Sequence, residues 1–196
     1  VERVDHFVYL GLEIAAKETC ATEIRRRIAL AGTSFAKFDK ILWKSQDVSL
    51  ETKLIVFNAS VILVLQYGCK SWNAPNHMQE ERLNAFENRC LRRILKVRWQ
   101  DHVNTTNLRE RASNQPFLSS ILHKRLLKWA GHVYRMNEER YPKMVVKWRP
   151  QGKQPRGRLW KRWSDKVKED LALVGELGLD IQDAAQDRER WRKIVW

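Results

Sequence analysis

Apolar residues near the start of the chain recur at the spacing of an α-helix. In residues 22–44 they follow one another at alternating steps of four and three. The positions are Ile24, Ile28, Ala31, Phe35, Phe38 and Leu42. This spacing gathers all of these side chains on one helical face, whereas the two-residue period of a strand would divide them between two faces. The segment is therefore predicted to be an amphipathic helix that buries its apolar face against other elements.

The same periodicity continues along most of the chain. Further helices are predicted at about 49–66, 78–97, 106–112, 117–136, 159–174 and 181–195. The first of these is apolar nearly all round, so we expect it to be central, and Ser49 is a suitable N-cap for it. Residues 141–150 fit either a short helix or an extended segment. The chain is thus predicted to be mainly α-helical.

The first residues have a different pattern. Val4–Ile14 is rich in β-branched and aromatic residues around Gly11, which predicts one or two short strands with a turn or bulge at the glycine. The predicted fold is a short β-hairpin at the N-terminus, then a helical bundle, then a second helical subdomain. The predicted domain ranges are 1–16, 17–100 and 101–196, with a break near Asp101–Gln115.

The charge balance points to a class of partner. The 196 residues include 37 Lys and Arg against 23 Asp and Glu, a formal net charge of +14. Such an excess favours polyanions, with nucleic acid first and acidic membrane surfaces second. Two of the predicted helices each concentrate positive charge on one face. The candidates are Arg89, Arg92, Arg93 and Lys96 on one helix, and Lys124 and Lys128 on another.

The densest basic block lies between Lys143 and Lys168, where Asp165 is the only acidic residue. Its Gly- and Pro-rich part predicts a loop that could follow a phosphate backbone or could simply be solvated. The candidate contacts are Lys153, Arg156, Arg158, Lys161 and Arg162. Trp160 and Trp163 fit the apolar stripe of the helix that follows, so core packing is favoured over stacking on unpaired bases.

Catalytic and metal-binding patterns are missing from the sequence. There is no Asp-Asp pair, no phosphate-binding loop, and no metal-ligand spacing among the histidines or the three cysteines. We expect buried or half-buried thiols, no catalytic residue, no metal and no cofactor. The apolar run Leu54–Leu65 is too short to span a bilayer and contains Asn58 and Ser60, so no membrane partner is expected.

Several blocks, in order, resemble the C-terminal part of LINE-type (non-LTR) retrotransposon reverse transcriptases of the endonuclease-containing kind. The blocks are VYLGLEI (Val8–Ile14), EIRRRIALAGTSFAKFDKILWKS (Glu23–Ser45), SLETKLIVFNASVILVLQYGCKSW (Ser49–Trp72), LNAFENRCLRRILKVRWQDHV (Leu83–Val103), RLLKWAGHVYRM (Arg125–Met136), GRLWKRWSDKVKEDL (Gly157–Leu171) and AAQDRERWRKIV (Ala184–Val195). The resemblance covers nearly the whole chain, although no single block is very specific.

The resemblance implies a primer-grip-like segment over residues 1–16, with Tyr9, Leu10 and Gly11 near the primer terminus. It also implies a thumb-like bundle over 17–100 and a basic C-terminal subdomain over 101–196. The family's catalytic Asp-Asp motif would lie before Val1. The family often has proline after Gly-Arg in the basic block, where this chain has Leu159.

The implied function is the binding of RNA, DNA or an RNA–DNA hybrid in the nucleus, as part of an RNA-directed DNA polymerase that as a whole would need Mg²⁺. The alternatives are a protein–protein interaction module, which would bind the missing palm and fingers or self-associate, and a truncated, nonfunctional remnant of the element. In both cases apolar faces that pack against a palm would be exposed.

Overall fold

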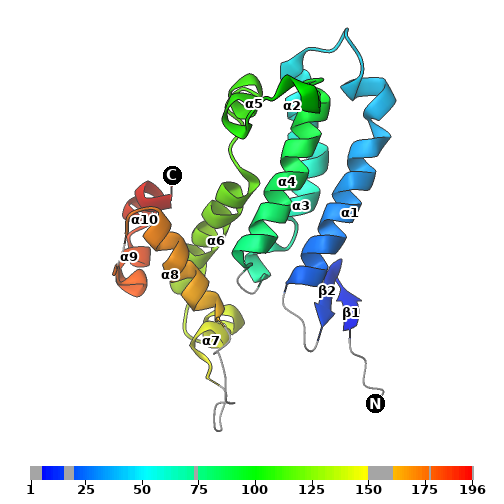
Figure 1. Ribbon diagram of the computed structural model, residues 1–196. Coiled ribbons are helices and arrows are strands. Elements are labelled where there is room, and N and C mark those ends of the chain that lie inside the picture. The colour runs from blue at the N-terminus through cyan, green and yellow to red at the C-terminus, as the bar shows by residue number, and fades with distance from the viewer. Residues whose placement is uncertain (1–5, 16–19, 73–74, 150–160, 177, 196) are drawn as a thin grey trace. The chain divides into compact units, whose positions relative to one another are not determined.

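The computed structural model is mainly α-helical, with one two-stranded antiparallel sheet at its beginning (Figure 1). It describes residues 6–15, 20–72, 75–149, 161–176 and 178–195. The predicted fold class, a short β-hairpin followed by helices, is confirmed. Residues 141–150, which the sequence left ambiguous, include a helix.

The elements follow one another with short connections. In chain order they are β1 (His6–Tyr9), β2 (Leu12–Ala15), α1 (Ala21–Lys37), η1 (Asp39–Trp43), α2 (Leu50–Phe57), η2 (Asn58–Ile62), α3 (Leu63–Gln66), η3 (Cys69–Ser71), α4 (His77–Ile94), η4 (Trp99–Asp101), α5 (Thr105–Arg111), α6 (Leu118–Tyr134), α7 (Tyr141–Lys147), α8 (Trp163–Leu173), α9 (Ile181–Gln186) and α10 (Arg188–Val195).

The chain divides into two compact units, and the division falls inside α6. The first unit comprises Val1–Cys69 and Pro75–Ile121, and the second comprises Lys70–Ala74 and Leu122–Trp196. The sequence-based ranges 1–16, 17–100 and 101–196 stay a prediction about domains.

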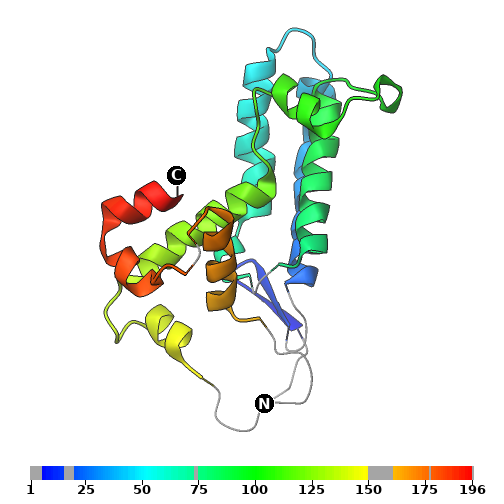
Figure 2. The same ribbon diagram turned by 60° about the vertical axis from the view of Figure 1, so that its left-hand side comes forward.

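In the first unit, α1, the continuous helical rod α2–η2–α3 and α4 lie alongside one another, as Figure 1 and Figure 2 both show. Ile24 and Ala31 from the predicted stripe of α1 are buried, together with Phe57 and Leu65 of the rod. Buried apolar area is the main source of stability for such a bundle. Periodicity on one face of α1 therefore predicted its packing correctly.

The predicted helix 22–44 is interrupted at Phe38. α1 ends at Lys37, and a wider helical turn over Asp39–Trp43 follows it. The Trp43 ring stacks on Phe35, with centroids 4.9 Å apart and planes at 11°. Its indole nitrogen also donates to the Phe35 carbonyl oxygen at 2.8 Å. Trp43 is completely buried, so side-chain packing accompanies the change of helical geometry.

The rod begins and continues as predicted. Ser49 Oγ accepts a hydrogen bond from the Thr52 backbone nitrogen at 3.2 Å, which confirms the N-cap. The rod passes through Asn58, whose side-chain amide exchanges hydrogen bonds with Gln115 at 3.3 and 2.8 Å. These contacts allow a polar residue inside an apolar helix.

The helical stretch around this rod is longer than the apolar run Leu54–Leu65. Leu50–Ser71, with a mean hydropathy of 1.4, could cross a membrane by length and composition alone. However, 44 % of the 18-residue apolar window within this stretch is buried inside the protein, and the core helix of a folded domain meets the same criterion. The absence of a membrane partner stays a prediction.

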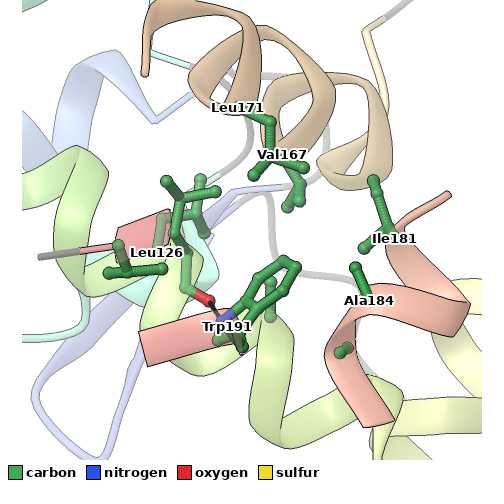
Figure 3. Close-up of a cluster of buried hydrophobic side chains, with 10 residues drawn as sticks. Leu126, Val167, Leu171, Ile181, Ala184 and Trp191 are labelled. Atoms are coloured by element: carbon green, nitrogen blue, oxygen red, sulfur yellow. Dashed lines mark hydrogen bonds between the residues drawn. The ribbon is translucent and has the colours of Figure 1, made fainter. Parts of the chain in front are cut away.

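The second unit is built around an apolar cluster between α6, α8, α9 and α10 (Figure 3). Its members include Leu126, Val167, Leu171, Ile181 and Trp191. The partly buried Trp163 packs against the same cluster, in agreement with the prediction that it is a core residue. Trp160 lies outside the described residues.

Two helix boundaries in the second unit differ from the prediction. α8 begins at Trp163 rather than near Leu159, because the Asp165 carboxylate accepts a hydrogen bond from the Arg162 backbone nitrogen at 2.9 Å and so caps the helix there. The predicted helix 181–195 is two helices. Asp187 has extended backbone angles between them, and its Oδ1 caps α10 by accepting from the Glu189 nitrogen at 2.9 Å.

Candidate nucleic-acid interface

The first candidate group is the turn of the β-hairpin. Tyr9 pairs with Leu12, so Leu10 and Gly11 form a two-residue turn, with φ of 47° and 75°. Positive φ at both positions is the geometry that suits a tight hairpin, and glycine adopts it without strain. Phe7, Val8, Tyr9 and Leu10 all have exposed side chains.

The turn is anchored by side chains that the sequence interpretation did not select. Tyr67 Oη donates to the Leu10 carbonyl oxygen at 2.6 Å, and Arg26 Nη1 donates to the Gly11 carbonyl oxygen at 3.0 Å. Arg27 also donates to the Gly11 carbonyl oxygen. Both turn carbonyls are therefore fixed to the helices beneath the hairpin.

Glu23 organises these anchors. It is 4 % exposed; its Oε1 accepts from Arg27 Nε at 2.5 Å and its Oε2 accepts from the Glu13 backbone nitrogen at 3.0 Å. The Arg27 guanidinium lies over the Tyr67 ring, 4.4 Å from its centroid. The four-residue spacing of Glu23 and Arg27 was the signal in the sequence that could have indicated this network.

The second group is the basic face of α4. The helix buries Cys90, Leu91 and Ile94. On the other side, Arg89 and Arg93 are exposed, Arg92 is half-buried, and Lys96 is exposed just after the helix ends. The structure thus brings these predicted residues together on one surface.

Two members of this surface have partners within the protein. Arg93 donates two hydrogen bonds of 2.9 Å to the Asp39 carboxylate, and Arg92 Nη2 donates to the Val103 carbonyl oxygen at 2.9 Å. Asp39 also pairs with Lys44 at 3.1 Å. The hydrogen bonds from Arg93, then from Lys44, lower the pKa of Asp39 to about 2. Asp39 carries one negative charge and contacts two cations, Arg93 and Lys44. The surface therefore keeps a net positive charge.

A buried ion pair holds α5 and the start of α6 against α4. Glu87 and Arg109 are 0 % and 6 % exposed, and Arg109 Nη2 donates to Glu87 Oε2 at 2.7 Å. The same carboxylate oxygen accepts from the Leu118 backbone nitrogen at 3.0 Å, while Arg109 Nη1 donates to the Gln115 carbonyl oxygen at 2.8 Å. Burial raises the pKa of Glu87, and the hydrogen bond from Arg109 opposes that rise. Arg109 is thus a structural cation.

The third group lies on α6 and before α8, in the second unit. Lys124 and Lys128 are exposed on α6, on the side away from the buried Leu126 and Leu127. Arg135 follows directly after the end of α6, and its Nη1 donates to the Ala185 carbonyl oxygen at 2.7 Å. Burial lowers the pKa of Arg135. Arg135 is therefore engaged within the second unit, and the predicted pair Lys124 and Lys128 forms the cationic side of α6.

The basic block after α7 is only partly described. Lys161 pairs with Glu169 at 2.6 Å, and Arg162 is half-buried at the start of α8. Lys153, Arg156 and Arg158 lie outside the described residues. The α4 group belongs to the first unit, and the groups on α6 and before α8 belong to the second.

No metal site is seen in the described part of the chain, and the Cys90 thiol is not activated. The described His, Cys, Asp and Glu residues form no cluster of three or more that could hold a metal ion. The three cysteines form no disulfide bond; Cys20 is half-buried and Cys69 and Cys90 are buried, as predicted. Burial raises the pKa of Cys90 to about 12, so its thiolate is not populated at neutral pH.

Comparison with known proteins finds a relative that aligns with the full length of the chain. The chain is similar to a transposon-derived protein. It is 27 % identical over 208 residues, covering 100 % of this chain and 71 % of the relative, to the uncharacterized transposon-derived protein F52C9.6 of Caenorhabditis elegans. No protein-family model and no solved structure matches the chain.

Proposed function

We propose that this chain is a nucleic-acid-binding module of retrotransposon origin, similar to the thumb and C-terminal segment of a LINE-type reverse transcriptase. It grips a duplex, with an RNA–DNA hybrid as the expected ligand, through the phosphate backbone. The observation that carries the proposal is the basic face of α4, where Arg89, Arg92, Arg93 and Lys96 lie opposite a buried apolar face.

The dimensions of this face suit a phosphate backbone. An α-helix rises about 1.5 Å per residue, so Arg89 and Arg93 are about 6 Å apart along the axis of α4, which is close to the rise of two nucleotides of one strand. Arginine and lysine side chains on such a ridge neutralise phosphates and release counterions, which provides affinity without base recognition. The exposed cations of α6 support a second contact of the same kind.

The same proposal includes what the chain does not do. It has no Asp-Asp pair to hold catalytic metal ions, so it binds without catalysing nucleotide transfer and needs no cofactor. Mg²⁺ would belong to the polymerase of the resembled family as a whole. The proposal includes a nuclear location, as the resemblance implies.

A matched pair of charge-removing variants tests the α4 surface. Arg89→Gln with Lys96→Gln removes two cations from α4, and Lys37→Gln with Lys40→Gln removes two exposed cations from the α1–η1 region of the same unit. Glutamine keeps much of the side-chain length while removing the charge. Binding to a fluorescent RNA–DNA hybrid should weaken in the α4 variant, with a salt slope shallower by up to about 2. Equal losses in the two variants would mean that only net charge matters, and would refute a site on α4.

A specific observation favours the alternative of a protein-interaction module. Helix α7 has an exposed apolar stripe at helical spacing, formed by Tyr141, Met144, Val145 and Trp148. Exposed stripes of this kind recruit partners or cause self-association. Size-exclusion chromatography with light scattering, with and without RNA, separates the two functions. An oligomer that is indifferent to RNA and salt, and that dissociates on Val145→Glu, would favour the alternative.

A further inference from the structure

Trp99 is an exposed tryptophan in a protein that buries several others. Its side chain is 79 % exposed, whereas Trp43, Trp72 and Trp191 are at most 4 % exposed. An exposed indole does not contribute the large burial energy that a core tryptophan provides, so we expect the side chain to serve in binding. We infer that Trp99 is a stacking platform for an unpaired base of a single-stranded nucleic acid, an inference that rests on the proposed function.

The turn that carries Trp99 is firmly held. The Asp101 carboxylate accepts a hydrogen bond of 2.7 Å from the Arg98 backbone nitrogen, and the His102 nitrogen donates to the Trp99 carbonyl oxygen at 3.3 Å. His102 takes the left-handed conformation, with φ of 47°, and its ring lies nearly perpendicular to the indole, with centroids 6.5 Å apart. These contacts fix the backbone on both sides of the exposed ring.

A second anchor ties the turn to the basic helix. The Arg92 guanidinium donates to the Val103 carbonyl oxygen at 2.9 Å, just after the turn, and the side chain of Asn104 caps α5 through the Asn107 nitrogen at 2.8 Å. The turn is therefore clamped between α4 and α5. A platform fixed before binding loses little conformational entropy when a base stacks on it.

The charge around the platform suits a phosphate backbone. Lys96 and Arg98 are both exposed and lie within three residues of Trp99. The nearest acid in sequence, Asp101, already accepts the Arg98 backbone hydrogen bond. An aromatic ring flanked by cations is the combination that binds single strands: the ring stacks on a base while the cations contact the phosphates.

The ligand is an unpaired base and not a base pair within a duplex. In a continuous duplex the faces of the bases are covered by their neighbours, so an indole cannot stack on them without opening the helix. An unpaired template overhang or a single strand offers a free face. The platform therefore extends the backbone contacts of α4 with a contact specific to single strands.

Four proteins test this: wild type, Trp99→Ala, Trp99→Phe and, as control, Ile41→Ala. Ile41 is another large apolar side chain of the first unit and is 78 % exposed. Each is titrated, by fluorescence anisotropy over a salt series, into a short labelled oligouridine strand and into a blunt-ended hairpin duplex. Thermal unfolding checks that the exposed substitutions leave the fold intact.

The expected result is that Trp99→Ala weakens binding to the single strand about tenfold, which corresponds to about 1.4 kcal/mol, without changing the salt slope. Trp99→Phe should keep most of the affinity, Ile41→Ala should resemble wild type, and duplex binding should change less than twofold. Wild-type affinity of Trp99→Ala for the strand, or an equal loss on strand and duplex, would overturn the inference while leaving the proposed function intact. Failure of wild type to bind either ligand would overturn both.

Discussion

Trp191 lies directly against Gly131, so that a methyl group on this glycine would come within 2.2 Å of the indole nitrogen. The same nitrogen donates to the Leu127 carbonyl oxygen, one helical turn earlier in α6, at 3.0 Å. A bare backbone at residue 131 is thus what lets α10 approach α6. Trp191 is also a member of the apolar cluster of the second unit (Figure 3).

Gly131→Ala should destabilise the second unit. Alanine normally stabilises a helix interior relative to glycine by about 1 kcal/mol, but here the methyl group must displace the buried ring of Trp191, and overpacking of this kind costs about 1–3 kcal/mol. Gly32→Ala is the control, because a methyl group there meets the Phe86 ring at an ordinary 3.7 Å. Urea unfolding followed by circular dichroism should show a lower free energy of unfolding for Gly131→Ala and no decrease for Gly32→Ala. Similar gains in stability in both would contradict the packing described.

The buried pair of Glu87 and Arg109 gives a second prediction. Arg109→Met leaves the carboxylate buried without its cation, which should cost about 3–5 kcal/mol at neutral pH. Burial raises the pKa of Glu87 and Arg109 opposes that rise, so the variant should raise it further. A carboxyl whose pKa is higher in the folded state destabilises the protein as pH increases past its ordinary value.

The unfolding free energy of Arg109→Met should therefore be closer to that of wild type at pH 4 than at pH 8. Glu87→Gln combined with Arg109→Met removes the buried charge and should recover part of the loss at pH 8. A pH-independent deficit that the double variant leaves unchanged would mean that lost packing, and not an unpaired charge, causes the effect.

The ion pair of Asp39 and Arg93 gives a prediction about the pKa of the Asp39 carboxyl. The hydrogen bonds from Arg93 and Lys44 lower the pKa of Asp39 from 3.8 to about 2. The stability that this pair provides is present above pH 4 and is lost as pH falls from about 4 towards 2, because the folded-state pKa is the lower one. An NMR titration of the Asp39 carboxyl should give about 2 in wild type and a value nearer 3.8 in Arg93→Ala. An unchanged midpoint in the variant would show that the pair does not form in solution.

The basic block after α7 gives a prediction on binding. Alanine at Lys153, Arg156, Arg158, Lys161 and Arg162 together should make the salt dependence of binding shallower, because fewer phosphates are neutralised. Of these, Lys161 already pairs with Glu169, so restoring Lys161 alone should recover little of the slope. A slope equal to that of wild type in the five-residue variant would remove this block from the interface.

Local patterns predicted local structure well. The stripe beginning at Ile24 and the cap at Ser49 follow from spacing and hydrogen-bonding chemistry within a few residues, and both were predicted correctly. The hairpin around Gly11 was predicted for the same reason. The sequence signal for each of these features lies within one short segment of the chain.

The structural features that the sequence did not indicate depend on residues that are distant in the chain. The turn of helix at Trp43 accompanies packing on Phe35 and Phe57, and Arg109 is fixed by Glu87 on another helix. Arg135 donates to the carbonyl oxygen of Ala185, which is distant in sequence. Periodicity identifies which face carries a charge, but it cannot show which charges are already neutralised by the fold.

The salt dependence of binding to an RNA–DNA hybrid tests the central claim most directly. Affinity of the wild-type chain is measured by anisotropy over a range of KCl concentrations. We expect log K to fall linearly with log[KCl], with a steep slope that reflects several phosphate contacts. Weak binding with a slope near zero would contradict a nucleic-acid-binding function.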